Sequence, residues 1–156
     1  MKPCRALLLG ILPLLLAGCI STGTGPGQGR GEPATTGSIT LSGPTFGDVT
    51  LAPSACRSGQ HEVFLGADFS SPDSPLVLRL AIDPLDPPGV RIFDRNDRNA
   101  RTLVVRKADC QIFQLTLGRT GWQLNDIYVL KASLELDCRL PGGDSIAGKA
   151  ETASCS

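Results

Sequence analysis

The stretch "IYVLKASLELDC" at residues 127–138 decides the fold class of this chain. Over most of its length apolar residues alternate with polar ones, from Leu130 to Cys138. Strict alternation is the pattern of a β-strand with one buried face. No window of eleven or more residues elsewhere in the chain carries a helical stripe of apolar residues. The stretch therefore predicts a strand in an all-β protein.

Short runs of the same kind follow one another along most of the chain, and turn signals such as "SPDSP" and "PGGD" separate them. The runs cover residues 38–41, 48–51, 62–69, 76–82, 90–93, 102–107, 110–117, 127–138 and 145–155. Many short strands with Gly and Pro at their joints are typical of an antiparallel β-sandwich or barrel. We expect a single domain of this class over residues 38–156.

Four cysteines fall inside this domain, and they are Cys56, Cys110, Cys138 and Cys155. An even number of cysteines in an exported domain indicates two disulfides. Metal binding is the competing use of cysteine, and it requires close pairs with nearby histidine. These cysteines lie 54, 28 and 17 positions apart, and His61 is the single histidine of the chain. We therefore expect disulfides and no metal.

The pairing of the four cysteines follows from strand geometry. If "PGGD" turns a hairpin, Cys138 lies near its tip and Cys155 lies about 25 Å further along, beyond the roughly 7 Å that a disulfide spans. The runs on either side of "GRTGWQLND" would form an antiparallel pair centred near Leu124. That register places Cys110 opposite Cys138. We predict Cys110 with Cys138 and, by elimination, Cys56 with Cys155.

The N-terminal segment has the plan of an export signal. Lys2 and Arg5 precede residues 6–17, which are apolar apart from Gly10 and Pro13. The run is shorter than the about 20 residues that a membrane-spanning helix needs, and a basic start with a short apolar centre is typical of a signal peptide. The run ends in "LAGC" at residues 16–19, which resembles the lipobox of bacterial lipoproteins.

This resemblance implies that Cys19 receives a lipid. A diacylglyceryl group would be attached to its thiol, the chain would be cleaved between Gly18 and Cys19, and a fatty acid such as palmitate would be added to the new amino group. Each buried methylene contributes about 0.8 kcal/mol, so two or more acyl chains anchor firmly where one does not. An ordinary cleaved signal with an incidental cysteine is the alternative. Because Ile20 rather than Asp follows the cysteine, the resemblance favours the outer membrane over the inner membrane.

The segment after Cys19 has the composition of a linker. Residues 20–37 contain six glycines and four threonines but no aromatic residue. Such a segment cannot bury enough apolar surface to fold, and its root-mean-square span would be about 20–25 Å. A solvated spacer is favoured over a binding segment. The expected organisation is a signal peptide over residues 1–18, a lipidated N-terminus and linker over 19–37, and the β domain over 38–156.

The charge of the expected mature chain is close to balance. Removal of Lys2 and Arg5 leaves 13 basic residues against 15 acidic ones, which argues against a nucleic-acid partner. Basic residues do gather between Arg91 and Lys107, with two aspartates among them, Asp94 and Asp97. A solvated loop and strand face is favoured there over an anion-binding patch for lipopolysaccharide or cell-wall polymer.

The sequence offers little evidence for a catalytic site. His61 has no second histidine to act with, and neither G-x-S-x-G nor H-E-x-x-H occurs. Asp83 and Asp86 lie beside prolines and are expected to shape turns, although two aspartates converging across strands, as in a glycosidase, are the alternative. The acidic and amide residues of "DRNDRN" at 94–99 favour a polar turn over a calcium loop, because the spacing and the glycine of such a loop are missing. We expect no enzymatic activity and no cofactor.

These observations together predict a lipid-anchored binding or scaffolding lipoprotein of the cell envelope. It would be an accessory component of an outer-membrane or surface assembly for secretion, motility or adhesion, contacting the membrane through its anchor and an envelope protein as partner. The alternatives are a module that binds cell-wall or surface glycan and, less favoured, a small hydrolase. A glycan module usually presents exposed aromatic rings, and Trp122 and Tyr128 are the only Trp and Tyr of the chain.

Overall fold

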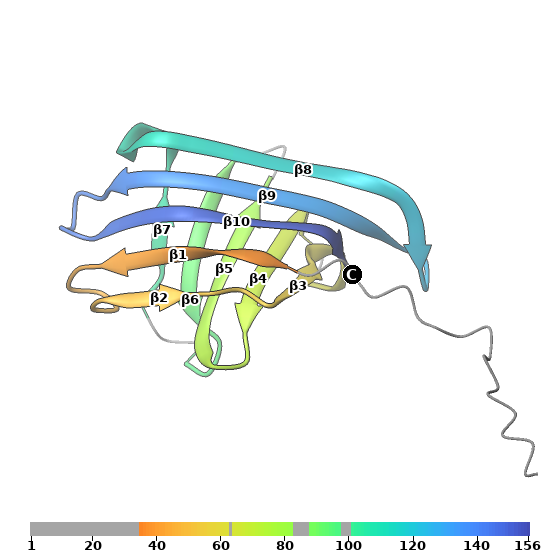
Figure 1. The fold of residues 1–156 in the computed structure, drawn as a ribbon, viewed down its shortest axis with the longest axis horizontal. Coiled ribbons are helices and arrows are strands. Elements are labelled where there is room, and N and C mark those ends of the chain that lie inside the picture. The colour runs from red at the N-terminus through yellow and green to blue at the C-terminus, as the bar shows by residue number, and fades with distance from the viewer. Residues whose placement is uncertain (1–34, 63, 83–87, 98–100) are drawn as a thin grey trace, which may run out of the picture.

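The structure is a computed structural model that describes residues 35–156 except 63, 83–87 and 98–100. The predicted signal peptide, Gly18, Cys19 and most of the predicted linker lie outside the described residues. The described chain forms two five-stranded antiparallel sheets, and its only helical segments are two 3-10 turns (Figure 1). The all-β fold expected from the sequence is therefore confirmed.

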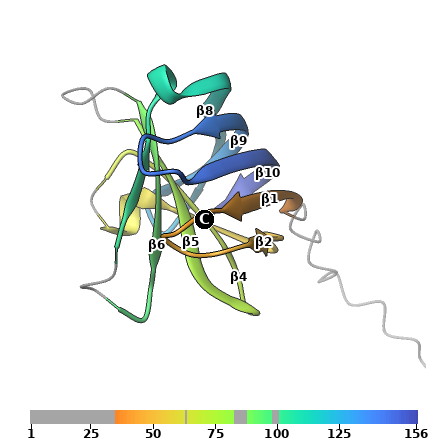
Figure 2. The same ribbon diagram turned by 90° about the vertical axis from the view of Figure 1, so that its left-hand side faces the viewer.

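We call the two sheets A and B. Sheet A consists, in spatial order, of β2 (Val49–Leu51), β1 (Thr36–Ser42), β10 (Ser145–Cys155), β9 (Ile127–Arg139) and β8 (Cys110–Leu124). Sheet B consists, in spatial order, of β3 (Ala55–Ser58), β4 (Gly66–Ser71), β5 (Ser74–Ala81), β6 (Gly89–Asp94) and β7 (Leu103–Val105). The sheets pack face to face with their strands crossing at a steep angle (Figures 1 and 2). This is the orthogonal form of sheet packing.

The strands follow one another in chain order around the two sheets. The chain forms β1 and β2, builds the whole of sheet B as a meander, and returns through β8, β9 and β10. Strand β10 then pairs with β1, from Ser42 opposite Ser145 to Thr36 opposite Glu151. Two-residue turns make this path possible, as at Asn125 and Asp126, whose φ angles of 50° and 64° are those of a type I′ hairpin turn.

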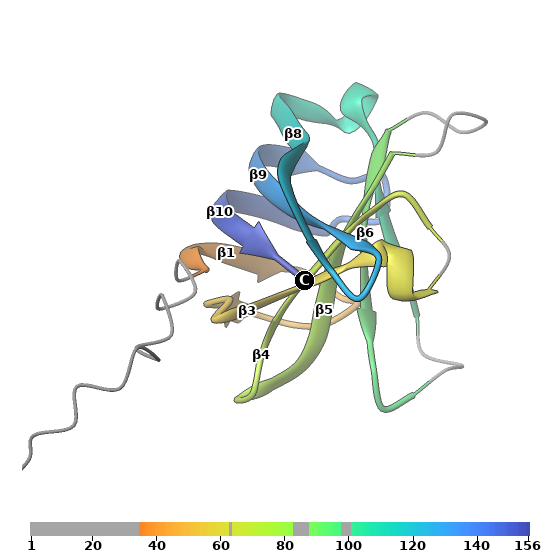
Figure 3. The same ribbon diagram turned by 90° about the vertical axis from the view of Figure 1, so that its right-hand side faces the viewer.

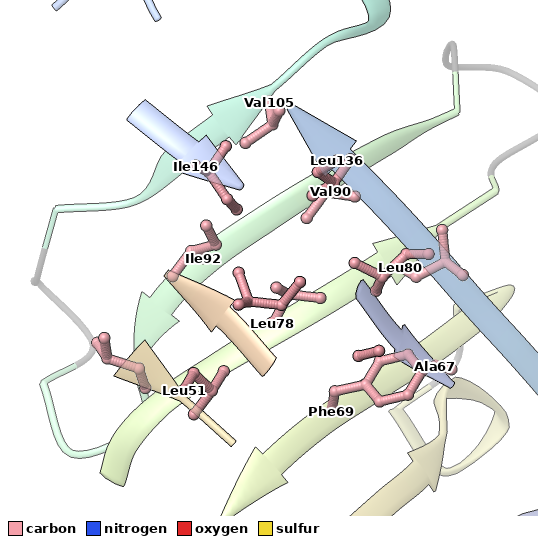
Figure 4. Close-up of a cluster of buried hydrophobic side chains, with 14 of the residues drawn as sticks. Leu51, Ala67, Phe69, Leu78, Leu80, Val90, Ile92, Val105, Leu136 and Ile146 are labelled. Atoms are coloured by element: carbon pink, nitrogen blue, oxygen red, sulfur yellow. The ribbon is translucent and has the colours of Figure 1, made fainter. Parts of the chain in front are cut away.

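The core lies between the sheets and is built from the inward faces of the strands (Figure 4). Alternate residues of β9 from Leu130 to Cys138 are buried, which confirms the alternation on which the fold prediction depends. They meet fully buried side chains of sheet B, with Phe69 the largest. The residues of the core that have no exposed surface include Ile39, Ala67, Phe69, Leu78, Leu80, Val90, Ile92 and Val105.

Sheet B departs most from the sequence prediction. The expected strand at 62–69 is wrong at its start: Glu62 ends the 3-10 turn η1 (Gly59–Glu62), and β4 begins only at Gly66. The backbone turns back there, with the amide of Phe64 donating to the carbonyl of Gly59 at 3.0 Å. Strand β3 was not predicted, because "ACRS" has too few apolar residues to alternate; its pairing with β4 makes it a strand.

In sheet A the differences concern strand ends. Strand β1 begins at Thr36, two residues before the expected start of the domain. Strand β8 runs on to Leu124, so most of "GRTGWQLND", expected to separate two strands, is itself strand. The second 3-10 turn, η2 (Lys107–Asp109), precedes β8.

The two disulfides are the pairs that the sequence predicted. Cys56 of β3 is joined to Cys155 of β10, so this bond links the two sheets. Cys110 is joined to Cys138, and this bond links β8 and β9 within sheet A.

The two cysteines are paired as predicted, but the register expected for them, centred near Leu124, is wrong. The β8–β9 turn lies beyond Leu124, which pairs with Ile127. Two irregularities, one between Arg119 and Gln123 and one between Cys110 and Ile112, then shift the pairing. Bulges insert extra residues into one strand of a pair. Here they move Cys110 into line with Cys138.

Candidate functional site

A cleft of about 740 Å³ lies on the outer face of sheet B, the face turned away from sheet A. We call it the sheet B cleft. Its lining is Ala55, Cys56, Arg57, Glu62, Asp68, Ser70, Val77, Arg79, Phe93, Asp94, Arg95, Asp97, Thr102 and Ser156. Strands β3 to β6 supply its floor, and Glu62 of η1 and the segment after β6 supply its sides.

Strand register places charged residues side by side on this floor. Arg57 of β3 lies opposite Asp68 of β4, which lies opposite Arg79 of β5, which lies opposite Arg91 of β6. The residues before and after Asp68, Ala67 and Phe69, point into the core. Because side chains alternate along a strand, Asp68 must then point to the outer face.

Arg79 is the most constrained side chain of the cleft. Its Nε and Nη2 atoms donate to the two carboxylate oxygens of Asp68 at 2.8 and 2.7 Å, and Nη2 also donates to Glu62. Its guanidinium carbon lies 4.0 Å from the centre of the Phe64 ring and 5.1 Å from that of Phe93. Two carboxylates and two rings hold the guanidinium in one position, since both kinds of contact are attractive for Arg.

Burial controls the protonation of this group. Asp68 is only 8% exposed, and loss of water around the carboxylate raises its pKa above the usual 3.8, although the hydrogen bonds and charge of Arg79 oppose the shift. The pKa of Arg79 is raised, chiefly by its hydrogen bonds to Asp68. The effect of burial on the pKa of Asp68 is therefore larger than the opposing effect of Arg79. The guanidinium of Arg79 stays charged.

A second arginine fixes the side of the cleft. Arg95 follows β6, and its Nη2 donates to the carbonyl of Ser71 at 2.6 Å and also to that of Ser74. Its backbone amide donates to the carbonyl of Pro75 at 3.0 Å. These bonds join the turn after β6 to the β4–β5 turn, so the wall of the cleft is tied to its floor.

The charge of the cleft differs from the basic patch considered in the sequence. Arg91 points outward and is exposed, Arg95 lines the cleft, and Arg101, Arg106 and Lys107 are exposed. Arg98 lies outside the described residues. The described lining holds three arginines and four acidic side chains. The cleft thus carries fixed charges of both signs.

Comparison of the chain with protein-family models, with curated proteins and with solved structures finds no match. Function is therefore argued from the chain's own residues.

Of the remaining sequence candidates, those whose side chains the structure describes lie outside the cleft lining. Asp83 and Asp86 lie outside the described residues, and the backbone of His61 belongs to η1. Trp122 lies near the end of β8, outside the cleft lining. Asp144, in the expected "PGGD" turn, is buried and accepts hydrogen bonds from the amide and hydroxyl of Thr45 at 2.9 and 2.8 Å.

Neither a metal site nor a membrane helix is found in the described part of the chain. Its His, Cys, Asp and Glu residues form no group of three that could hold a metal ion. None of its helical segments is long and apolar enough to cross a membrane.

Sequence reasoning missed Arg57, Asp68 and Arg79 as site residues. Each has an ordinary position in its strand, and only the register of three strands brings them together. The available signal was a charged residue inside two strongly apolar runs, Asp68 in "GADF" and Arg79 in "LVLRLA". Charged residues are almost never buried without a partner.

Proposed function

We propose that this chain is a lipid-anchored protein of the cell envelope that binds a partner protein through the sheet B cleft. The observation that carries the proposal is the cleft itself, whose fixed guanidinium of Arg79 is held by Asp68 and Glu62. A preorganised site loses little side-chain freedom when it binds, which favours recognition.

The lining suggests the chemistry of the partner. Val77 and Phe93 provide an apolar part of the floor, which also carries charges of alternating sign in the row Arg57, Asp68 and Arg79. A peptide segment that carries an apolar side chain between one basic and one acidic residue complements such a surface. An accessory protein of an envelope assembly would bind a segment of this kind.

A binding role is favoured over a hydrolytic one. Asp68 and Glu62 both accept hydrogen bonds from Arg79, so both carboxylates are already engaged in holding the guanidinium. The described lining contains hydroxyl groups but no histidine that could activate them. A glycan ligand is less favoured, because Phe93 is the only aromatic residue of that lining.

The lipid anchor is supported by the lipobox resemblance of residues 16–19 and by the disulfides, which are typical of proteins exported to an oxidising compartment. Mass spectrometry of the mature N-terminus should find Cys19 carrying a diacylglyceryl group. The variant Cys19→Ser should accumulate as an uncleaved precursor. An unmodified N-terminus at any other residue would contradict the anchor.

The binding role is tested with a charge reversal in the cleft. Arg57→Glu changes an exposed residue of the lining, and Arg139→Glu makes the same change at an exposed residue of sheet A, outside the cleft. A partner captured from solubilised envelopes should be lost with Arg57→Glu and kept with Arg139→Glu. Equal loss or equal retention would overturn the cleft as the binding site, and binding of purified cell-wall fragments instead would favour the glycan alternative.

A further inference from the structure

The end of the β8–β9 hairpin presents an apolar surface to solvent. Trp122 is 66% exposed and Leu124 is 56% exposed. They are two residues apart on β8 and so share a face, and Leu124 lies opposite Ile127 on β9. Val129 continues this face on β9. We call these four residues the hairpin tip.

The other face of the hairpin holds the tip in a fixed direction. Gln123 lies opposite Tyr128, which packs against the core, and Arg119 stacks over the Tyr128 ring at 4.1 Å. The side chain of Gln60 in η1 bonds the backbone of Tyr128 twice, donating to its carbonyl at 3.0 Å and accepting from its amide at 3.3 Å. The apolar face is therefore turned outward by contacts with the body of the domain.

The hairpin tip lies at the end of the domain where the N-terminal segment enters. Thr36, the first residue of β1, lies opposite Glu151, which lies opposite Ser133 of β9. From Ser133 the strand continues for six residues to Ile127, about 20 Å further in the same direction. Figures 1 and 3 show the start of β1, the end of β10 and the β8–β9 turn on the same side of the molecule.

The expected span of the N-terminal segment is similar to the distance by which the hairpin tip extends beyond the start of β1. Residues 19–35 separate the predicted lipid anchor from β1, and their Gly-rich composition predicts a root-mean-square span of about 20–25 Å. The tip projects about 20 Å beyond the first residue of β1. A domain tethered in this way carries its tip to the surface in which the anchor is embedded.

Charge along the outward face of β9 agrees with this orientation. Lys131 is the first charged residue behind the tip, and Glu135 and Asp137 follow only toward the opposite end. Trp is enriched at membrane interfaces, and Lys beside it keeps its ammonium group at the level of the lipid headgroups. Glu135 and Asp137 are then held farther from the lipid than Lys131, and Asp126 of the β8–β9 turn is the acidic residue that lies beside the tip.

We propose that the hairpin tip is a second membrane contact, in which Trp122 and Leu124 enter the headgroup region of the bilayer that carries the Cys19 anchor. This inference rests on the lipid anchor of the proposed function. The anchor raises the effective concentration of the tip at the surface, so two exposed apolar side chains suffice where they would not hold a free domain. The contact would set the orientation of the domain on the membrane.

The experiment uses Trp122 as its own reporter, because it is the only tryptophan of the chain. The acylated protein is reconstituted into vesicles of phosphatidylethanolamine and phosphatidylglycerol, with and without brominated phosphatidylcholine. We expect the emission of Trp122 to shift to the blue and to lose most of its intensity with the brominated lipid. Unchanged emission that remains accessible to iodide would overturn the proposal.

A matched control moves the tryptophan along the same strand. Ile112 lies at the other end of β8, on its outward face, about 30 Å from the tip. In the double variant Trp122→Phe, Ile112→Trp, brominated lipid should leave the emission unchanged. Quenching at both positions would mean that the domain lies flat, and a blue shift that grows with protein concentration without lipid would assign the tip to a second copy; either result overturns the proposal.

A second form of the experiment tests the tip contact independently of whether Cys19 is acylated in the cell. The mature chain beginning at Cys19 is coupled through that thiol to a maleimide lipid in the same vesicles, so the tether is supplied whether or not the cell acylates it. Quenching in this arm supports the tip contact, and Leu124→Ser should reduce it. If mass spectrometry finds no acyl group while this arm shows quenching, the proposed anchor fails and the geometry of the tip stands.

Discussion

The outer faces of the two sheets differ in how much of them is covered. In sheet A, β9 alternates between buried and more exposed residues, so only its inner face is covered. In sheet B, Asp68 and Val77 are 8% and 7% exposed although they belong to the outer face. The side chains of Phe64 and Arg79 and the segments after η1 and β6 cover that face. A sheet covered on both faces can hold charges in a fixed arrangement, which an open face cannot.

The ion pairs on these two faces illustrate the same difference. The side chains of Arg79 and Asp68 are 21% and 12% exposed, whereas those of Lys149 and Glu151 on sheet A are 55% and 52% exposed. Exposed pairs contribute little to stability, while a partly buried pair that loses one partner leaves a costly charge. The sheet B pair is therefore a fixed part of the fold, and the sheet A pair is a feature of the surface.

The largest expected effect comes from the disulfide that joins the sheets. The Cys56–Cys155 bond closes a loop of 99 residues and the Cys110–Cys138 bond one of 28. Loop-closure entropy then gives a loss of about 4.7 kcal/mol for Cys56→Ala, Cys155→Ala against about 3.6 kcal/mol for Cys110→Ala, Cys138→Ala. Urea unfolding of the two double variants measures the difference. A larger loss for the Cys110–Cys138 pair would show that the link between the sheets is the lesser constraint.

The second largest effect is expected when the guanidinium of Arg79 is removed from the covered outer face of sheet B. Arg79→Met leaves Asp68 without its bidentate partner, and we expect the free energy of unfolding to fall by about 2–3 kcal/mol. Lys149→Met on the open face is the control and should leave the unfolding midpoint unchanged. Equal effects of the two changes would break the distinction between the faces.

An apolar pair of variants tests the same difference without charge. Val77 is buried on the outer face of sheet B, whereas Val129 is half-buried on that of sheet A. Loss of two methyl groups should cost about 1.5 kcal/mol for Val77→Ala. Val129→Ala should cost a clearly smaller amount, since its side chain is already partly in water. Thermal unfolding of both variants gives the comparison, which a reversed order would contradict.

The smallest expected effect is a pH dependence from Asp68. Burial raises its pKa in the folded protein above the usual 3.8, so the folded state holds the proton more tightly than the unfolded state. As the pH rises from 3.8 through the folded value, the wild-type protein should lose stability relative to Asp68→Asn, and the difference should be constant above that range. Urea unfolding across acidic pH measures it. Asp137→Asn, at an exposed carboxylate of sheet A, is the control. A wild-type protein that gains stability relative to Asp68→Asn as the pH rises would contradict the sign.

Strand periodicity predicted sheet A better than sheet B, and the covered face explains why. Strand β10 was predicted with its exact bounds and β9 to within one residue, because one face of each is open and the residues alternate. Strand β4 is buried on nearly every residue and β3 is too short to show a period, so neither was placed correctly. Alternation is informative only where one face meets water.

The sequence by itself determined the all-β class and the lipobox resemblance, because these depend on local periodicity, on turn residues and on the spacing within a single segment. It also predicted the two cysteine pairs, but on a simpler β8–β9 register than the structure has. The tertiary structure alone decided the row of Arg57, Asp68 and Arg79, the bulges that align Cys110 with Cys138, and the position of Trp122 at the end where β1 begins. Each of these depends on the register between paired strands, which no single segment of the sequence carries. Register is set by packing of whole faces, and a shift of one residue would turn every side chain to the opposite side.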